Sequence, residues 1–210
     1  MEIMDLVNML ARWGHLLFGM TWIGLLYYFN FIQGGYFKSA TPEGLKDAKA
    51  KLAPEALWWF RWGAMFTFLT GLVLLAGVGK MHVMNDFIVV GAALGTLMFM
   101  NVWMIIWPNQ KIALGLVEGD AATAGPKALL ASRTNVLFSA PMAFCMMAGP
   151  HFGGYGMGVG SIAMWIALAI VAALFINGLK GKQGPMTTVR GVIVSSLVLT
   201  VVLVGILKVL

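Results

Sequence analysis

The sequence predicts an all-α protein, a polytopic membrane bundle of about six transmembrane helices, on the basis of its composition and the spacing of its apolar runs. The chain of 210 residues is 60% hydrophobic and only 10% charged, with a mean hydropathy of +0.87. A soluble domain carries about a quarter charged residues and could not hide so much apolar surface from water. Six stretches approach the roughly 20 apolar residues that cross a bilayer: 8–32, 57–79, 84–107, 133–150, 157–179 and 190–209. No internal repeat or shift of composition divides them, so we expect residues 1–210 to form a single domain.

The basic residues predict the orientation, because Lys and Arg gather on the cytoplasmic side of membrane proteins. Of the 14 basic residues, one side of the predicted bundle holds Lys38, Lys46, Lys49, Lys51, Arg61, Lys111, Lys127, Arg133, Lys180, Lys182 and Arg190. The other side holds only Arg12, Lys80 and Lys208. We therefore expect both termini on the periplasmic side of a bacterial inner membrane. The net charge of +6 reflects these loops and does not indicate a nucleic-acid partner.

Two inner loops are predicted to carry short surface helices. Thr41-Pro42-Glu43 is typical of a helix start, with a cap residue followed by proline, and the charged run 45–52 continues it. Residues 121–130 resemble this pattern, with Gly125-Pro126 expected to break the helix.

All three histidines are predicted to lie towards the outer side of the membrane. His15 is near the outer end of the first helix, His82 is in the loop after the second, and His151 ends the fourth. Imidazole pairs are the usual axial ligands of a haem b held between membrane helices, so one haem b is the predicted cofactor. The single cysteine, Cys145, excludes an internal disulfide and a cysteine-ligated cluster.

One face of the first helix carries residues that could line a haem-binding pocket. Arg12, His15, Gly19 and Trp22 are three and four residues apart, which places them on one side of a helix. Arg12 can neutralise a propionate, and His15 can ligate iron. Gly19 lets a flat ring approach the backbone, and Trp22 can pack on its edge. The alternative is that Gly19 serves helix packing, as small residues do in membranes, and that the histidines bind no metal.

His151 is the preferred second iron ligand. It ends a membrane helix and precedes the glycine-rich segment FGGYGMGVG, which could close over a cofactor. His82 follows Lys80 in a loop and is the weaker candidate, since a solvated surface residue explains it equally well.

A polar belt is predicted in the inner half of the bundle, where ionisable groups are costly and usually functional. Arg61, Asn101, Arg133 and Asn135 are the predicted substrate-binding residues. Two guanidinium groups with amide side chains can hold a planar anion, because guanidinium supplies paired donors and amides supply donors and acceptors. The alternative is that the arginines sit among the lipid head groups and only fix the topology.

Four motifs resemble the membrane domain of the bacterial cytochrome-c-linked urate oxidases, the urate oxidase N-terminal family. They are RWGHLLFGMTWIGLLYYFNF, WWFRWGAMFT, NVWMIIWPNQK and SRTNVLFSAPM, and the likeness covers about residues 8–151. The resemblance implies an oxidoreductase domain that passes electrons from urate to a periplasmic cytochrome c. Residue by residue, it picks out Arg12, His15, Gly19, Trp22, Arg61, Asn101, Trp107, Pro108, Asn109, Gln110, Arg133 and Asn135.

The sequence departs from the full-length family members. They carry a C-terminal cytochrome c domain, which has no counterpart in the sequence up to Leu210, so we expect a short stand-alone form. The leading hypothesis is a haem-b redox protein of the inner membrane that exchanges electrons with cytochrome c and oxidises urate or a similar small donor. The alternative hypothesis is a non-catalytic accessory subunit of a respiratory or other membrane oxidase complex.

Overall fold

The computed structural model describes residues 3–80, 84–152 and 159–210, and these residues form helices and no strand. Except for α7 and α8, each long helix has one or more short helical elements before or after it. The elements are α1 (Ile3–Tyr27), η1 (Tyr28–Gln33), α2 (Gly34–Ser39), α3 (Pro42–Asp47), η2 (Ala48–Leu52), α4 (Ala53–Lys80), α5 (Asp86–Met100), η3 (Asn101–Ile106), α6 (Trp107–Ala113), α7 (Ala121–Phe152), α8 (Ile162–Lys180), η4 (Gly184–Thr187) and α9 (Val189–Val209). The predicted all-α class is therefore confirmed for the described residues.

Five helices are long and apolar enough to cross a membrane: Ile3–Ser39, Pro42–Val78, Asp86–Ala113, Ile162–Lys180 and Val189–Val209. These helices correspond, with ends that differ by a few residues, to five of the six predicted spans. The sixth prediction, 133–150, lies within α7, which is 32 residues long but is not among these five. The reason is the polar run 132–135, whose residues are all buried. A helix enclosed by other helices can be polar where it does not face lipid.

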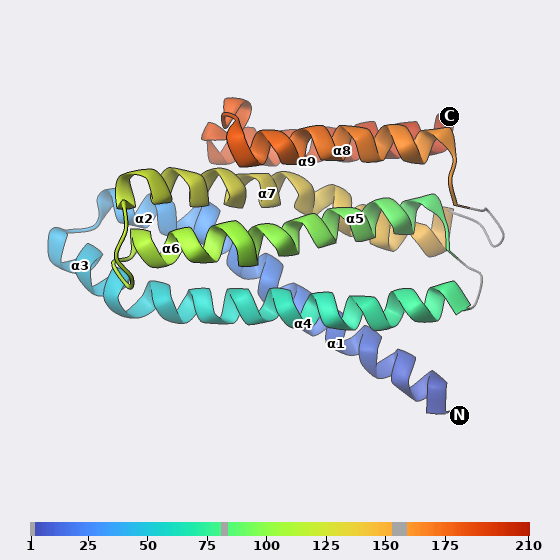
Figure 1. The fold of residues 1–210 in the computed structure, drawn as a ribbon, viewed down its shortest axis with the longest axis horizontal. Coiled ribbons are helices and arrows are strands. Elements are labelled where there is room, and N and C mark those ends of the chain that lie inside the picture. The colour runs from blue at the N-terminus through green and yellow to red at the C-terminus, as the bar shows by residue number, and fades with distance from the viewer. Residues whose placement is uncertain (1–2, 81–83, 153–158) are drawn as a thin grey trace.

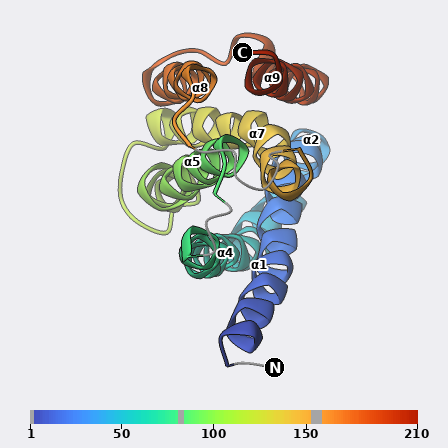
Figure 2. The same cartoon turned by 90° about the vertical axis from the view of Figure 1, so that its right-hand side faces the viewer.

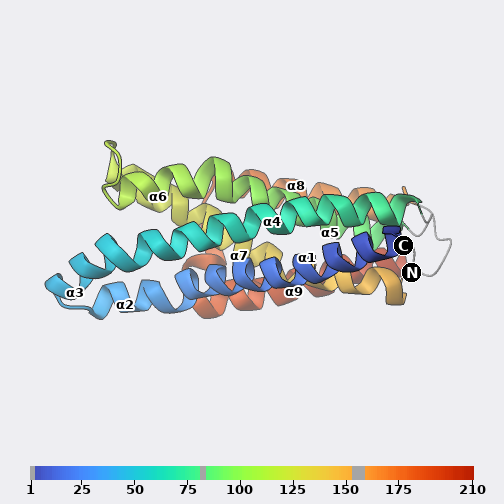
Figure 3. The same ribbon diagram turned by 90° about the horizontal axis from the view of Figure 1, so that it is seen from below.

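Helix α7 is the centre of the bundle. It contacts α1, α5, α6, α8 and α9. Seen along the bundle, α8 and α9 form a layer above α5 and α7, and α1 with α4 lies below them (Figure 2). Helices α1 and α4 cross closely along much of their length (Figure 3). Both described chain ends lie at the same end of the bundle, together with the last turn of α4, the first of α5, the last of α7 and the first of α8, and the other connections lie at the opposite end (Figure 1).

The predicted surface helix after residue 41 is confirmed, and the predicted break in the second one is wrong. The Thr41 side chain accepts a hydrogen bond from Gly44 N at 3.2 Å, and α3 and η2 follow it. By contrast, α7 runs unbroken through Gly125-Pro126. Pro126 lacks the N–H that would bond Ala122 O, and the burial of Ala124 and Ala128 on either side of it offsets this loss. Asp120 precedes α7, and hydrogen bonds from the Thr123 hydroxyl and Ala122 N lower the pKa of its carboxyl.

The α1–α4 contact is tight because small residues line it. A Cβ on Gly63 would lie 3.2 Å from Trp22 N, and Trp22 itself is only 2% exposed. A Cβ on Gly14 would touch Phe18 and Thr70. Close approach at small residues is how membrane helices gain van der Waals contact without a hydrophobic driving force.

We predict that Gly63→Leu destabilises the protein by about 1–3 kcal/mol, since the new side chain must push α1 away from α4. Gly24→Leu is the matched control, because Gly24 is exposed on α1 and a Cβ there meets nothing within 4 Å. Thermal unfolding of both variants in the same detergent measures the difference. Equal stability of the two variants would contradict the assigned α1–α4 contact.

Candidate functional site

His15 lies on the α1–α4 contact and is held by α4. Its Nδ1 is 2.8 Å from Thr67 O and 3.2 Å from Thr70 Oγ1. A carbonyl oxygen can only accept, so Nδ1 carries the proton and donates it, and the Nε2 lone pair of the neutral ring stays free. This is the arrangement of a metal-ligating histidine, whose other ring nitrogen donates to a backbone carbonyl. His15 therefore fits an axial iron ligand.

The other predicted haem-lining residues of α1, which are Arg12, Gly19 and Trp22, lie in different environments. Arg12 is exposed. A Cβ on Gly19 would lie 3.9 Å from Thr67 Cγ2, and Trp22 is buried beside Gly63. Gly19 and Trp22 thus contribute to the α1–α4 contact. A group bound at His15 would have to lie along the part of this face that α4 leaves free.

The second histidine is separate from the first within the described residues. His151 is exposed near the end of α7, where Lys208 Nζ donates to Phe152 O at 2.7 Å and Asn85 Nδ2 donates to Gly149 O at 2.9 Å. No hydrogen bond joins His151 to His15 among the residues with assigned positions, and no group of three or more His, Cys, Asp or Glu is placed there to hold a metal ion. His82 and most of the glycine-rich segment lie outside the described residues. The iron-ligand pair stays a prediction.

The inner polar belt is built around α7. Asn101 Nδ2, on η3, donates to Asn135 Oδ1 at 2.8 Å, and Asn135 Nδ2 donates to Met98 O at 3.0 Å. Asn101 is 1% exposed and Asn135 is fully buried. The structure thus brings two predicted site residues together. Both ends of the Asn135 amide are engaged, so Asn135 positions Asn101, whose Oδ1 is buried without a partner.

A second amide meets α7 from η1. Asn30 Nδ2 donates to Leu26 O at 2.8 Å and to Ser132 Oγ at 2.7 Å, while Asn30 Oδ1 is buried without a partner. Three residues further on, Gln33 Oε1 is also buried and unpartnered. Both η1 and η3 are wide π-helical turns, which are rare and often occur at functional sites.

Arg133 is a deeply buried cation. It is 8% exposed, and its Nε and Nη1 have no hydrogen-bond partner among the described residues. No ion pair joins Arg133 to a carboxylate within the described part of the chain. An ion pair is formed instead at the surface, between Lys51 and Asp47 (2.6 Å). That surface pair raises the pKa of Lys51 through its hydrogen bond to Asp47.

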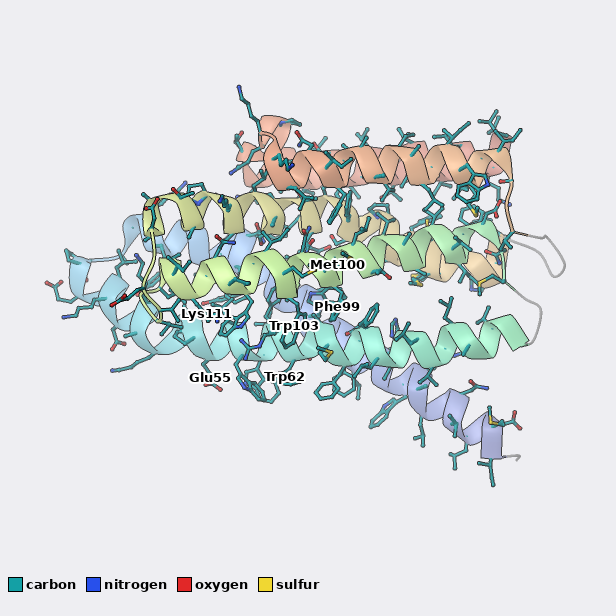
Figure 4. All side chains as sticks on the ribbon, viewed as in Figure 1. Glu55, Trp62, Phe99, Met100, Trp103 and Lys111 are labelled. Carbon is teal, nitrogen blue, oxygen red and sulfur yellow. The ribbon has the colours of Figure 1, made fainter. Side chains whose placement is uncertain are left out.

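Arg61 has a different environment. Its guanidinium carbon lies 3.7 Å from the centre of the Trp107 ring and 5.6 Å from that of Trp103, and its Nη1 is buried without a partner. Trp103 in turn meets Trp62 of α4, with ring centres 5.7 Å apart (Figure 4). The small hollow at Arg61 is lined by Leu57, Phe60, Arg61, Val102, Ile106 and Trp107. None of these residues belongs to α7, so this hollow does not include Arg133.

The sequence analysis left Ser132 and Trp103 out of the site, and it placed Asn30 in the polar belt without counting it among the substrate-binding residues. Asn30 had a readable signal, since an amide in the middle of an apolar span is costly. Ser132 had none, because its part in the belt depends on the register between α1 and α7.

The fold and the belt define a polytopic membrane protein with a buried, cationic, amide-lined site. The family model described as urate oxidase N-terminal matches residues 79–204, more than half of the chain. The chain belongs to this family. The match includes the NVWMIIWPNQK and SRTNVLFSAPM motifs and not the two motifs before residue 79. It continues beyond the expected likeness, which ended at about residue 151, through α8 and into α9. Neither a curated protein nor a solved structure matches significantly.

We predict that Asn135→Leu lowers stability by about 1–3 kcal/mol, because it leaves the buried Asn101 amide without its partner and removes a hydrogen bond to Met98 O. Asn177→Leu is the control, since that exposed amide binds only Lys182 O in a loop. Chemical unfolding in mild detergent compares the two. A loss no larger than that of the control would show that the Asn101–Asn135 pair is not formed.

Proposed function

We propose that this chain is a six-span oxidoreductase of the bacterial inner membrane that oxidises urate or a similar planar anion. A haem b at His15, with His151 as the preferred second ligand, would carry electrons one at a time to a periplasmic cytochrome c. The observation that carries the proposal is Arg133: a charge more than nine-tenths buried, without a counter-ion in the described residues. Removing such a charge from water is expensive unless an anion compensates it.

The proposed topology has α7 as the sixth span and both termini in the periplasm. It is supported by the chain ends, which lie at the same end of the bundle, as an even number of crossings requires (Figure 1). The lysines of α2, α3 and η2 lie at the opposite end, which is therefore the cytoplasmic one.

The chemistry of the proposed anion site divides among the belt residues. Arg133 supplies charge-assisted donors, which are stronger than neutral ones. Asn101 presents its unpartnered Oδ1, and Asn135 holds Asn101 in that orientation. Arg61 lies at a separate hollow that no residue of α7 lines, so it is not part of this proposed site. The belt is in the inner half, on the side where a cytoplasmic donor would enter, and His15 is in the outer half of the continuous helix Ile3–Ser39.

The topology has a direct test. Single cysteines replacing Lys38 and Lys208, in a Cys145→Ser background, should differ in their reaction with an impermeant maleimide on spheroplasts. We expect labelling at position 208 only. Labelling at position 38 from outside would reverse the orientation, and the assignment of the histidines to the periplasmic half with it.

The haem has a spectroscopic test. His15→Ala should abolish or convert the low-spin b-type spectrum of protein expressed with adequate haem, since His15 is the oriented ligand. His151→Ala should do the same, and His82→Ala should leave the spectrum nearly unchanged. Reduced-minus-oxidised spectra of the three variants measure this. Wild-type protein without a Soret band would end the haem proposal.

The anion site has a binding test. Arg133→Met should weaken urate binding by about 2–3 kcal/mol, on the order of a hundredfold, and slow cytochrome c reduction in proportion. Arg190→Met, the same change of charge at an exposed position of the inner end, should bind as wild type does. No reduction by the wild type, together with co-purification of a large membrane complex, would favour the accessory-subunit hypothesis.

A further inference from the structure

The orientation of the Asn30 amide is fixed by its surroundings. Leu26 O is a carbonyl and can only accept, so the NH₂ group of Asn30 must face it, and that same group reaches Ser132 Oγ. Turning the amide over would set Oδ1 against the Leu26 oxygen. Asn30 Oδ1 is therefore the end that stays free, in a side chain only 5% exposed.

The same reasoning fixes Asn101. Met98 O demands the NH₂ group of Asn135, so Asn135 Oδ1 faces Asn101, and the NH₂ group of Asn101 must meet it. Asn101 Oδ1 is the free end. The belt thus contains two buried amide oxygens that cannot turn away and that lack a donor.

The two side chains that carry these oxygens are held by the same face of α7. Asn30 is bonded to Ser132 and Asn101 to Asn135, and these partners are three residues apart on α7, hence on the same face of the helix. Arg133 is adjacent to Ser132 in the chain. The wide turns η1 and η3 therefore bring their amides to neighbouring positions on the helix that carries the unpaired cation.

This combination selects a class of ligand. Carboxylates and sulfate carry acceptors only at neutral pH, so they satisfy Arg133 but set their lone pairs against both amide oxygens. A metal cation would suit the amide oxygens, but the buried arginine repels it. A neutral ligand would leave the charge of Arg133 uncompensated. An anion with N–H groups on its edge satisfies both kinds of group.

We infer that Asn30 is a specificity-determining residue of the proposed anion site, where its Oδ1 accepts a hydrogen bond from a ring N–H and disfavours anions that carry acceptors only. The inference rests on the proposed function. Ser132 acts as a positioning residue, because it holds the NH₂ end of Asn30. The selectivity follows from the cost of a buried polar group without a partner.

The test measures equilibrium binding of urate, of urates methylated at each ring nitrogen in turn, and of benzoate and sulfate, to the protein in nanodiscs. For wild type we expect at least one N-methylated urate, as well as benzoate and sulfate, to bind roughly ten- to hundredfold more weakly than urate. In Asn30→Leu, the affinity for urate should fall to that for this methylated analogue. Asn177→Leu is the control, since Asn177 Nδ2 also donates to a backbone carbonyl, Lys182 O (3.1 Å), but at an exposed position outside the belt.

If Asn30→Leu does not fold, Asn30→Ser keeps a hydroxyl that can bond Leu26 O and still removes Oδ1, so the same loss of selectivity is expected. The inference is overturned if the Asn30 variants weaken all the anions equally or weaken none of them. Benzoate or sulfate binding to wild type as tightly as urate would overturn it as well, while leaving an anion site in place. Absence of binding by any of these anions would instead remove the proposed function itself.

Discussion

The structure depends on the need to satisfy a polar run, residues 132–135, inside a bilayer. Water is absent from the hydrocarbon region, so each polar group there must find its partner in the protein. Helix α7 therefore cannot lie at the periphery, and four other long helical segments, which contain α1, α5 with α6, α8 and α9, pack around it. The partners are specific: Ser132 receives Asn30, and Asn135 receives Asn101 and bonds Met98 O. On the other side of α7, Ser196 of α9 donates to Leu137 O at 2.9 Å.

The π-helical turns η1 and η3 follow from the same requirement. Asn101 begins η3, which ends just before Trp107-Pro108, and Pro108 has no N–H to give to the preceding turn. A wide turn there changes the register of the helix without breaking it. The change brings Asn101 against α7 while Trp103 turns towards α4, where it meets Trp62 and Arg61. The bundle thus gains a polar face and an aromatic face from adjacent residues of one helix.

The sequence predicted the helical class, the apolar spans and the Asn101–Asn135 neighbourhood, because hydropathy and rare intramembrane polar residues are visible in the chain itself. It failed at Gly125-Pro126, where the packing of the residues on either side, Ala124 and Ala128, outweighs the local preference against a helix. It left Ser132 out, since a serine in a membrane helix reveals nothing until its register against α1 is known. It also could not distinguish the environments of Arg61 and Arg133. Arg61 stacks on aromatic rings, whereas Arg133 has no such ring against it among the described residues.

The aromatic stacking of Arg61, which Arg133 lacks, determines which of the two arginines is the candidate for binding an anion. Arg61 rests on the Trp107 ring at 3.7 Å with Trp103 nearby, and the negative faces of these rings compensate part of its charge. Lys111, 5.3 Å from the Trp107 ring centre, competes for the same ring. Arg133 has neither a ring nor a carboxylate against it in the described part of the chain, although it is the more deeply buried of the two. Arg61 can therefore persist as a structural cation near the inner interface, whereas the buried, uncompensated charge of Arg133 is the reason for proposing an anion there.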